Sequence, residues 1–313
     1  MKISKLLLIT AATLFIPCLA YANIPDDNQD EITKTLDMFD KSKPPVQLAS
    51  ASSDETSTVE TSPIAVTPSS NAITPPATTE AETNTLFGNL LKKYDITPSG
   101  SVTLDYYSRY VWRGEYLDKD GVFEPGITLS AKGFSVGYWS NWDMVGSDPL
   151  NSNESDYFVS YAYTEGPLTI TGGHTWYSFP GTSTSSKEYF VSAGLSTFLS
   201  PVFTFYHDYE DGKDLGKGHG NYYSLALSNT MDIYKPYGIS LTLGTTIGYI
   251  DHQWINGRGF HFTPTMAINI PMTKSLTISP TIGYNITQGD LKDPAIGNQT
   301  DSAFGGVHSV VTF

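Results

Sequence analysis

Alternation of apolar and polar residues with a period of two dominates the last two thirds of the chain. The clearest example is ISLTLGTTIGYI, residues 239–250, in which apolar side chains are separated by small polar ones. Successive side chains of a β-strand point to opposite faces, so this pattern predicts strands whose two faces meet different surroundings. The pattern returns at 260–270 and 275–287. The predicted fold class is therefore all-β.

We expect about twelve such strands between residues 97 and 313. Most are close to the length of about 9–11 residues that a tilted strand needs to cross a bilayer. The strands are predicted at residues 100–113, 124–131, 134–145, 154–164, 168–179, 188–197, 201–210, 221–232, 238–250, 260–270, 275–287 and 303–313.

The connections between these strands alternate in length. Short turns such as 132–133 and 165–167 are followed by long polar segments such as 146–155, 211–220 and 288–301. Short turns at one end and long loops at the other are typical of up-and-down barrels of outer membranes, whereas Greek-key sandwiches do not require this regularity. The sequence thus predicts a transmembrane antiparallel up-and-down β-barrel of about twelve strands.

The composition of the two faces indicates which one meets lipid. The polar set consists mostly of Thr, Ser, Gly and Asn, rather than the Lys and Glu that keep the outside of a soluble barrel in solution. Such residues suit a hydrated lumen, so we expect the apolar set to face lipid. Tyr and Trp gather where strands enter long loops, as in an interfacial aromatic girdle, and Tyr110 and Trp112 are expected there.

The chain before the barrel is predicted to have two parts. Residues 1–22 combine early lysines, an apolar run and an Ala-Tyr-Ala ending, which is typical of a signal peptide. Residues 23–96 are expected to form a periplasmic, Ser/Thr/Pro-rich and largely disordered extension, with short helices at 31–41 and 84–94. The barrel itself is expected to span 97–313, in the outer membrane of a Gram-negative bacterium.

Net charge and cysteine content exclude several classes of protein. A formal charge of −14 and a pI of about 4.7 give a nucleic-acid-binding role no electrostatic basis. The one cysteine, Cys18, lies in the predicted signal peptide, so no disulfide or thiol chemistry is expected in the mature chain. The sequence contains no EF-hand, zinc or phosphate-binding motif, and we expect no cofactor, no metal and no catalytic residue.

Residues 107–143 resemble the opening motif of the TorF-type porin family, also called Gcw_chp. An aromatic-x-aromatic-Arg-Gly strand end, a proline, a Gly-x-x-x-Gly hairpin and a Trp-Ser-Asn run carry the resemblance: Tyr110, Trp112, Arg113, Gly114, Pro125, Gly133, Gly137, Trp139, Ser140 and Asn141. Phe313, with Val311 and Ser309, resembles the C-terminal signature that the outer-membrane assembly machinery recognises. The resemblance implies a small outer-membrane barrel.

A twelve-stranded barrel lies between small filled barrels and wide porins, so a narrow passage is expected. Inward charges that would set ion selectivity are Asp105, Arg109, Arg113, Glu124, Asp143, Glu154, Asp156 and Asp208. Bulky side chains expected to narrow the passage are Tyr107, Trp139, Tyr177 and Tyr206. The excess of carboxylates predicts a weak preference for cations.

Two of these charges, Arg109 and Arg113, are expected on one strand, with Glu124 and Asp143 across from them. This group would be either a selectivity element or a structural cluster of ion pairs. The predicted function is passive diffusion of small solutes or ions. The alternative is a structural or adhesion barrel, whose loops or N-terminal extension bind a partner or the cell wall.

An enzyme is the least favoured class. Some outer-membrane barrels are lipid hydrolases, and His174 and His207 fall on the outward parity. His174 is expected opposite Val191 or Ala193 on one side and Tyr157 on the other. None of these offers a nucleophile or an orienting carboxylate, so a Ser-His arrangement is not predicted.

The predicted outer-membrane barrel has several expected partners. They are outer-membrane lipid and lipopolysaccharide, the assembly machinery through Phe313, small solutes or ions, and the cell wall through residues 23–96.

Overall fold

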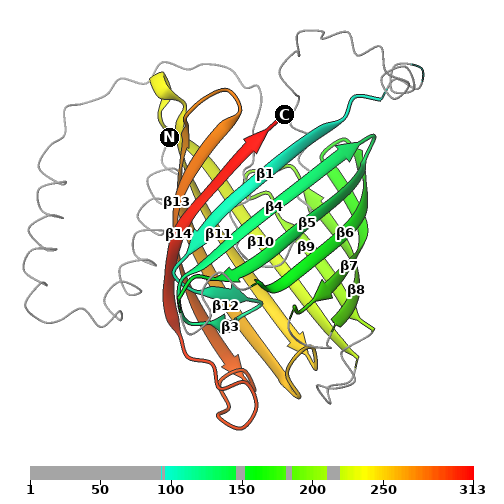
Figure 1. Ribbon diagram of the computed structural model, residues 1–313, viewed down its shortest axis with the longest axis vertical. Helices are drawn as coiled ribbons and strands as arrows, with labels where there is room; N and C mark the ends of the chain where they lie inside the picture. Colours follow the sequence, from blue (N-terminus) through cyan, green and yellow to red (C-terminus); the bar gives the residue numbers. More distant parts are fainter. Residues whose placement is uncertain (1–92, 94–95, 146–151, 181–184, 210–218) are drawn as a thin grey trace, which may run out of the picture. The chain divides into compact units, whose positions relative to one another are not determined.

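The computed structural model describes residue 93 and residues 96–145, 152–180, 185–209 and 219–313, and its main feature is a closed barrel of twelve strands (Figure 1). The barrel strands are β1 Ser99–Tyr107, β4 Val122–Ala131, β5 Phe134–Asp143, β6 Ser152–Glu165, β7 Leu168–Ser178, β8 Ser185–Leu195, β9 Val202–Asp208, β10 Gly220–Tyr234, β11 Ile239–Asp251, β12 Arg258–Pro271, β13 Leu276–Gly289 and β14 Ser302–Thr312. The predicted strand number and up-and-down order are confirmed.

Every barrel strand pairs antiparallel with its neighbour in the chain, and β1 pairs with β14 to close the ring. Val102 lies opposite Val311, and two backbone hydrogen bonds of 2.8 and 3.0 Å join Gly100 to Phe313. The start of β1 and the end of β14 therefore lie together, at the end of the barrel that carries the short turns (Figure 1).

The turn between β4 and β5 shows how local sequence sets the short-turn end. Lys132 and Gly133 both have positive φ, at 50° and 84°. Positive φ at both central residues defines a two-residue turn of type I′, whose twist matches that of the strands it joins. Glycine enters this region of φ without the steric cost that a Cβ would bring.

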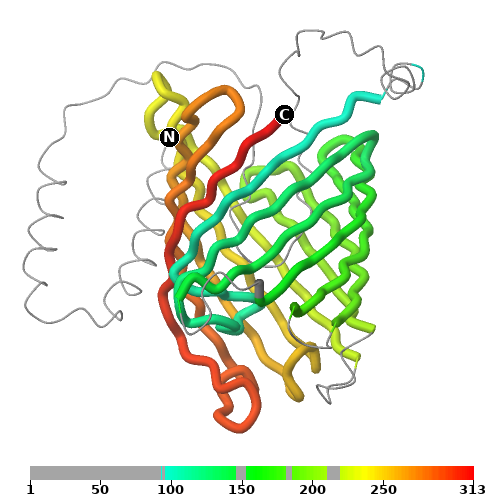
Figure 2. The backbone as a smooth tube through the Cα atoms, in the orientation of Figure 1, coloured from blue at the N-terminus to red at the C-terminus, as the bar shows by residue number. Residues whose placement is uncertain are grey.

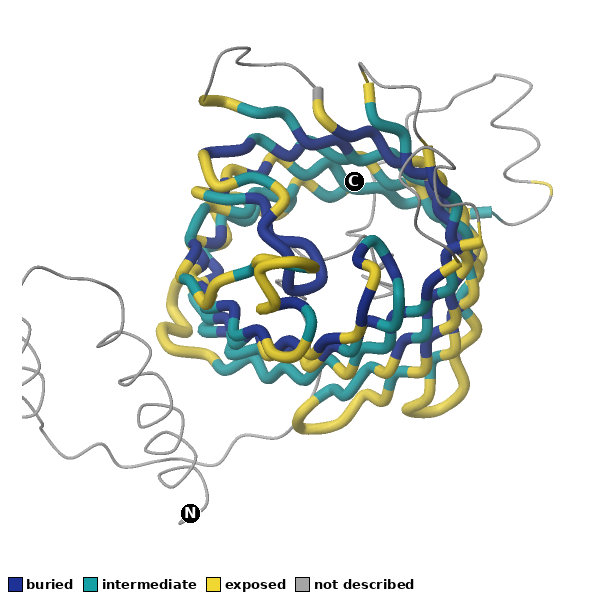
Figure 3. The backbone as a smooth tube through the Cα atoms, turned by 90° about the horizontal axis from the view of Figure 1, so that it is seen from below, coloured by how far each residue is buried: buried dark blue, intermediate teal, exposed yellow. Residues whose placement is uncertain are grey.

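Burial alternates along the strands as a transmembrane barrel requires. On β6, Tyr157 and Val159 are 52% and 36% exposed, whereas the intervening Phe158 and the following Ser160 are each 5% exposed. The outward set is apolar and the inward set is rich in Thr, Ser and Asn. Figure 3 shows how buried and more exposed residues alternate along the strands. The predicted orientation of the two faces is confirmed, and the fold is a transmembrane β-barrel.

The first predicted strand, 100–113, is wrong beyond Tyr107. The chain leaves the wall after β1 and forms a separate hairpin of β2 (Tyr110–Trp112) and β3 (Glu115–Asp118), which we call the inner hairpin. Figure 2 shows its backbone turning away from the wall, and Figure 3 shows buried loop segments inside the ring. A period of two predicts a strand but not the wall to which the strand belongs.

Tyr110 and Trp112 accordingly do not lie on the lipid face. Their side chains are only 6% and 5% exposed, inside the barrel. The reversal occurs at Arg113 and Gly114, whose φ values of 48° and 85° form a two-residue turn of the same kind as the one between β4 and β5. The aromatic girdle predicted at this point is therefore corrected to an aromatic filling of the lumen.

Several predictions fall on residues outside the described part of the chain. These are the signal peptide and nearly all of the extension 23–96, including both expected short helices except Lys93. Among the described residues, no helix is both long enough and apolar enough to cross a membrane.

Candidate functional site: the lumen of the barrel

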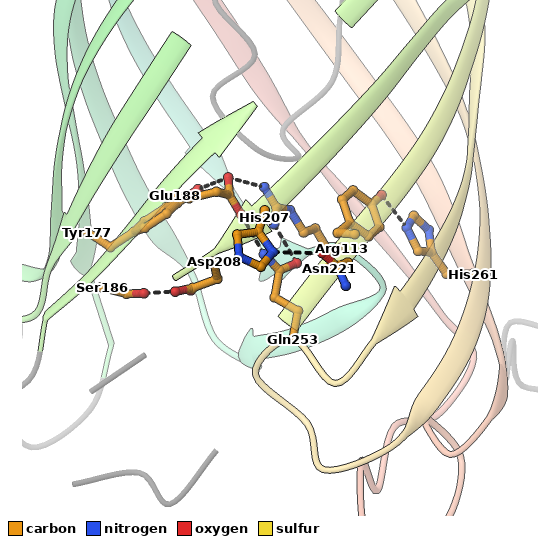
Figure 4. Close-up of polar contacts among 10 residues, drawn as sticks. Arg113, Tyr177, Ser186, Glu188, His207, Asp208, Asn221, Gln253 and His261 are labelled. Atoms are coloured by element: carbon orange, nitrogen blue, oxygen red, sulfur yellow. Dashed lines mark hydrogen bonds and ion pairs between the residues drawn. The ribbon is translucent and has the colours of Figure 1, made fainter. Parts of the chain in front are cut away.

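A buried ion pair holds the tip of the inner hairpin against the wall. Both terminal nitrogens of Arg113 donate to the carboxylate of Glu188 on β8, at 2.6 and 2.8 Å, and neither side chain has any exposed surface (Figure 4). Gln253, in the connection between β11 and β12, accepts from Arg113 and donates to Glu188. The hydroxyl of Tyr177 also donates to Glu188, at 2.9 Å.

Aromatic rings surround the same guanidinium. Its central carbon lies 4.1 Å from the ring centre of Tyr206, 4.4 Å from that of Trp112 and 4.6 Å from that of Tyr222. Burial disfavours the charged form, but the contacts with Glu188, Tyr177 and Tyr206 together outweigh burial, and the pKa of Arg113 is raised above its ordinary value. Arg113 is therefore charged at any physiological pH.

The inner hairpin is also fixed to the opposite wall of the barrel. The side-chain amide of Asn285 on β13 donates to the carbonyl of Gly114 at 2.8 Å, and the hydroxyl of Tyr116 donates to the carbonyl of Ser302 at 2.6 Å. Arg109 donates to the hydroxyl of Ser302 as well. Because β8 and β13 are five strands apart in the ring, these contacts make the hairpin span the lumen.

Three of the four predicted constricting residues form one aromatic cluster with the inner hairpin. Tyr107 and Tyr177 are buried, Trp139 is half-buried, and all three belong to the cluster that contains Tyr110 and Trp112. The rings of Tyr110 and Trp139 are 5.7 Å apart between centres. The narrow part of the lumen is thus built by wall and hairpin together.

The remaining constricting residue, Tyr206, belongs to a second cluster on the other side of the lumen, with Phe190, Tyr222, Ile250, Ile255 and Leu291. Ile255 and Leu291 come from the connections that follow β11 and β13. These two long loops therefore help to fill the same end of the barrel as the inner hairpin.

Four of the predicted charges line neighbouring strands on one side of the lumen. Asp105 on β1 lies opposite Glu124 on β4, and Glu154 and Asp156 follow on β6. All four are buried, with exposures of 2–8%. Asp105 accepts from Nδ1 of His308, and Glu154 accepts from the hydroxyl of Tyr110 at 2.8 Å.

The other predicted charges are distributed differently from the expectation. Arg109 and Arg113 do not share a barrel strand, and their partners are Ser302 and Glu188 rather than Glu124 and Asp143. Asp143, at the end of β5, accepts from the backbone N–H of Val145 at 2.9 Å. Asp208 on β9 accepts from the hydroxyl of Ser186 on β8 (Figure 4).

Sequence reasoning missed the residues that hold the inner hairpin. Glu188 sits on the inward parity of its strand, but its role depends on Arg113, which was expected elsewhere. Gln253 and Gln299 lie in loops, where no periodicity places a side chain. Asn285 was visible as an inward polar residue, although nothing in the sequence indicates that it donates to a backbone carbonyl in a distant loop.

The outward histidines do not form a hydrolase arrangement in the described residues. Nε2 of His174 lies 2.6 Å from the hydroxyl of Tyr209. The residues opposite it on the two adjacent strands are Val159 and Tyr189, so the predicted pairing with Tyr157 and with Val191 or Ala193 is wrong in register. Nδ1 of His207 lies 2.8 Å from the side-chain oxygen of Asn221. Within the part of the chain that the structure describes, neither ring forms a hydrogen bond to a serine hydroxyl or a carboxylate.

These features define a class: a transmembrane β-barrel with an apolar exterior, a polar interior and the inner hairpin folded across its lumen. Among solved structures, the chain is similar to the KdgM porin, with 12% identity over 68% of this chain and 99% of that chain and a TM-score of 0.45. It is also similar to the NanC porin, with 13% identity over 68% of this chain and 98% of that chain and a TM-score of 0.40.

A third similar structure is an outer membrane channel from Pseudomonas putida F1, with 10% identity over 69% of this chain and 95% of that chain and a TM-score of 0.41. No protein-family model and no curated protein matches the chain. The resemblance to the TorF-type family therefore stays a prediction. Identities and TM-scores this low leave the function to rest on the chain's own residues.

Proposed function

We propose that this protein is a narrow channel of the Gram-negative outer membrane, through which small solutes or ions diffuse passively. The single observation that carries the proposal is the inverted arrangement of the barrel, with apolar side chains outside and Ser, Thr, Asn and charged side chains inside. Polar interiors and apolar outer bands are general features of outer-membrane barrels that conduct.

The inner hairpin supports the narrowness of the channel. It crosses the lumen between β8 and β13 and carries Tyr110, Trp112 and Arg113 inward. Solutes that pass must therefore pass beside this hairpin. Small ions and small polar solutes fit this geometry better than large substrates.

The charges beside the hairpin support a weak preference for cations. Arg113 is bound by Glu188, so its charge is balanced within the pair. Asp105, Glu124, Glu154 and Asp156 line one side of the same lumen and give it an excess of negative charge. Charged groups in a pore select ions through the field that they project.

We also propose that residues 23–96 extend into the periplasm. The start of β1 lies at the short-turn end of the barrel, and in outer-membrane barrels the short turns face the periplasm. Lipid, lipopolysaccharide and the assembly machinery remain the expected partners of the exterior and of Phe313.

The decisive measurement is the current through purified, refolded protein in a planar lipid bilayer. In a KCl gradient, we expect discrete conductance steps and a reversal potential with the sign for K⁺ preference. A reversal potential with the sign for Cl⁻ would contradict the cation preference. Folded protein that never conducts would contradict the channel itself and favour a structural role.

A further inference from the structure

The side of the lumen that is lined by carboxylates carries two buried hydrogen-bond acceptors without a donor among the described residues. Asn141 on β5 lies opposite Glu154 on β6, and its side-chain nitrogen donates to Glu124 on β4 at 3.4 Å. Its side-chain oxygen is buried and, within the described residues, has no hydrogen-bond partner. Oδ1 of Asp156 is also buried and also has no hydrogen-bond partner within the described residues.

Both of these atoms are hydrogen-bond acceptors. A buried acceptor without a donor costs about 1–3 kcal/mol, more if the group is charged, so native structures rarely leave one unsatisfied. The missing group is therefore a donor. We call Asp105, Glu124, Asn141, Glu154 and Asp156 the acceptor row.

The acceptor row also has an uncompensated charge. Glu154 and Asp156 lie two residues apart on the inward face of β6, and Glu124 lies nearby on β4, so three buried carboxyl groups gather on this side of the lumen. Asp105 is bound to His308, whereas Glu124 accepts a long hydrogen bond of 3.4 Å from Asn141. Arg113, the buried cation of the inner hairpin, is bound to Glu188. An occupant of the row should therefore be positively charged.

Aromatic rings flank the same position. Trp139 lies directly opposite Asp156 in the sheet, and the hydroxyl of Tyr110 binds Glu154. The two rings are 5.7 Å apart between centres. Aromatic faces attract cations. Organic cations suit such a site better than small inorganic ions, because they are more weakly hydrated and give up less hydration free energy when they contact a ring.

We propose that the acceptor row is a binding site for a small organic cation whose N–H groups donate hydrogen bonds, as a guanidinium or primary ammonium group does. The inference rests on the proposed channel and names its preferred solute class. Bound at the inner hairpin, such a cation would slow the passage of other ions.

The test compares two ligands of equal charge. Butylguanidinium carries N–H donors, whereas butyltrimethylammonium has the same charge and tail but no donor. We expect millimolar butylguanidinium to reduce the single-channel K⁺ current and to give measurable heat in calorimetry of the detergent-solubilised full chain. Butyltrimethylammonium should bind roughly tenfold more weakly or worse, the loss expected for hydrogen bonds to charged groups.

Two variants localise the effect. Asp156→Asn should weaken butylguanidinium binding by roughly tenfold. Asp208→Asn removes the same charge from the lumen three strands away and should leave binding close to that of the unaltered chain. Glu124→Gln replaces Asp156→Asn if that variant does not fold.

Each outcome bears on one proposal only. A chain that conducts but binds both ligands equally, or loses binding equally in Asp156→Asn and Asp208→Asn, overturns the acceptor row as a site and leaves the channel intact. A chain that binds butylguanidinium in calorimetry without conducting overturns the channel and keeps the site.

Discussion

The ion pair of Arg113 and Glu188 fixes the inner hairpin inside the lumen. Both are completely buried, and each relies on the other to balance its charge. Removing one partner of a buried pair leaves an uncompensated charge, whereas removing both avoids that cost. The pair is thus a strong constraint on where the inner hairpin lies, even if its net contribution to stability is small.

Arg113→Met should lower the free energy of unfolding by about 3–5 kcal/mol, because Glu188 is left buried and unpaired. Arg113→Met combined with Glu188→Leu should recover most of this loss. Urea unfolding in detergent micelles, followed by tryptophan fluorescence, measures both changes. A double variant as unstable as the single one would show that the two side chains are not coupled.

At the scale of elements, the barrel strands were largely predictable and the inner hairpin was not. Eleven of the twelve predicted strands match barrel strands over most of their length, because alternation and bilayer-spanning length both follow from local sequence. The predicted first strand, 100–113, was wrong after Tyr107, because Tyr110 and Trp112 keep the alternation while the chain leaves the wall.

The residues around that failure explain why the sequence did not reveal it. The turn at Arg113 and Gly114 lacks the Asn-Gly or Asp-Gly pair that is the strongest hairpin signal. The hairpin's anchors come from Glu188, Gln253 and Asn285, which are distant in the chain. Inward carboxylates such as Glu124 and Asp156 were predictable from parity, but their grouping with Asn141 needed the register of the sheet.

Replacing residues 109–117 with a short Gly-Ser linker should widen the channel without unfolding it. Tyr110, which lies opposite Asp118 at the base of the hairpin, is two residues from Ser108, so a short linker can join Ser108 to Asp118. We expect single-channel conductance to rise roughly twofold or more, since the obstruction is removed from a barrel of unchanged strand number.

The matched control for this replacement is Leu117→Ala, at an exposed position of the same hairpin. Its conductance should equal that of the unaltered chain. An unchanged conductance in the linker variant, with the barrel still folded, would show that the hairpin does not limit the flow.

At the scale of the whole molecule, the fold depends on which side of the wall faces hydrocarbon. Leu225 and Ser224 are neighbours on β10 that point outward and inward. In liposomes, Leu225→Arg should cost about 2–4 kcal/mol if it lies near the midplane of the membrane, because a charged side chain is then placed in lipid. Ser224→Arg should cost much less, because its charge remains hydrated in the lumen. Equal costs would contradict the orientation of the barrel.

The pairing of β1 with β14 has a consequence for how the molecule is made. These two strands are separated by almost the entire barrel sequence, yet they form a single seam. Ring closure must therefore await the synthesis of β14, and every earlier intermediate carries two unpaired strand edges that invite association with other chains. Maturation of this protein should accordingly depend on help that shields those edges until the seam is sealed.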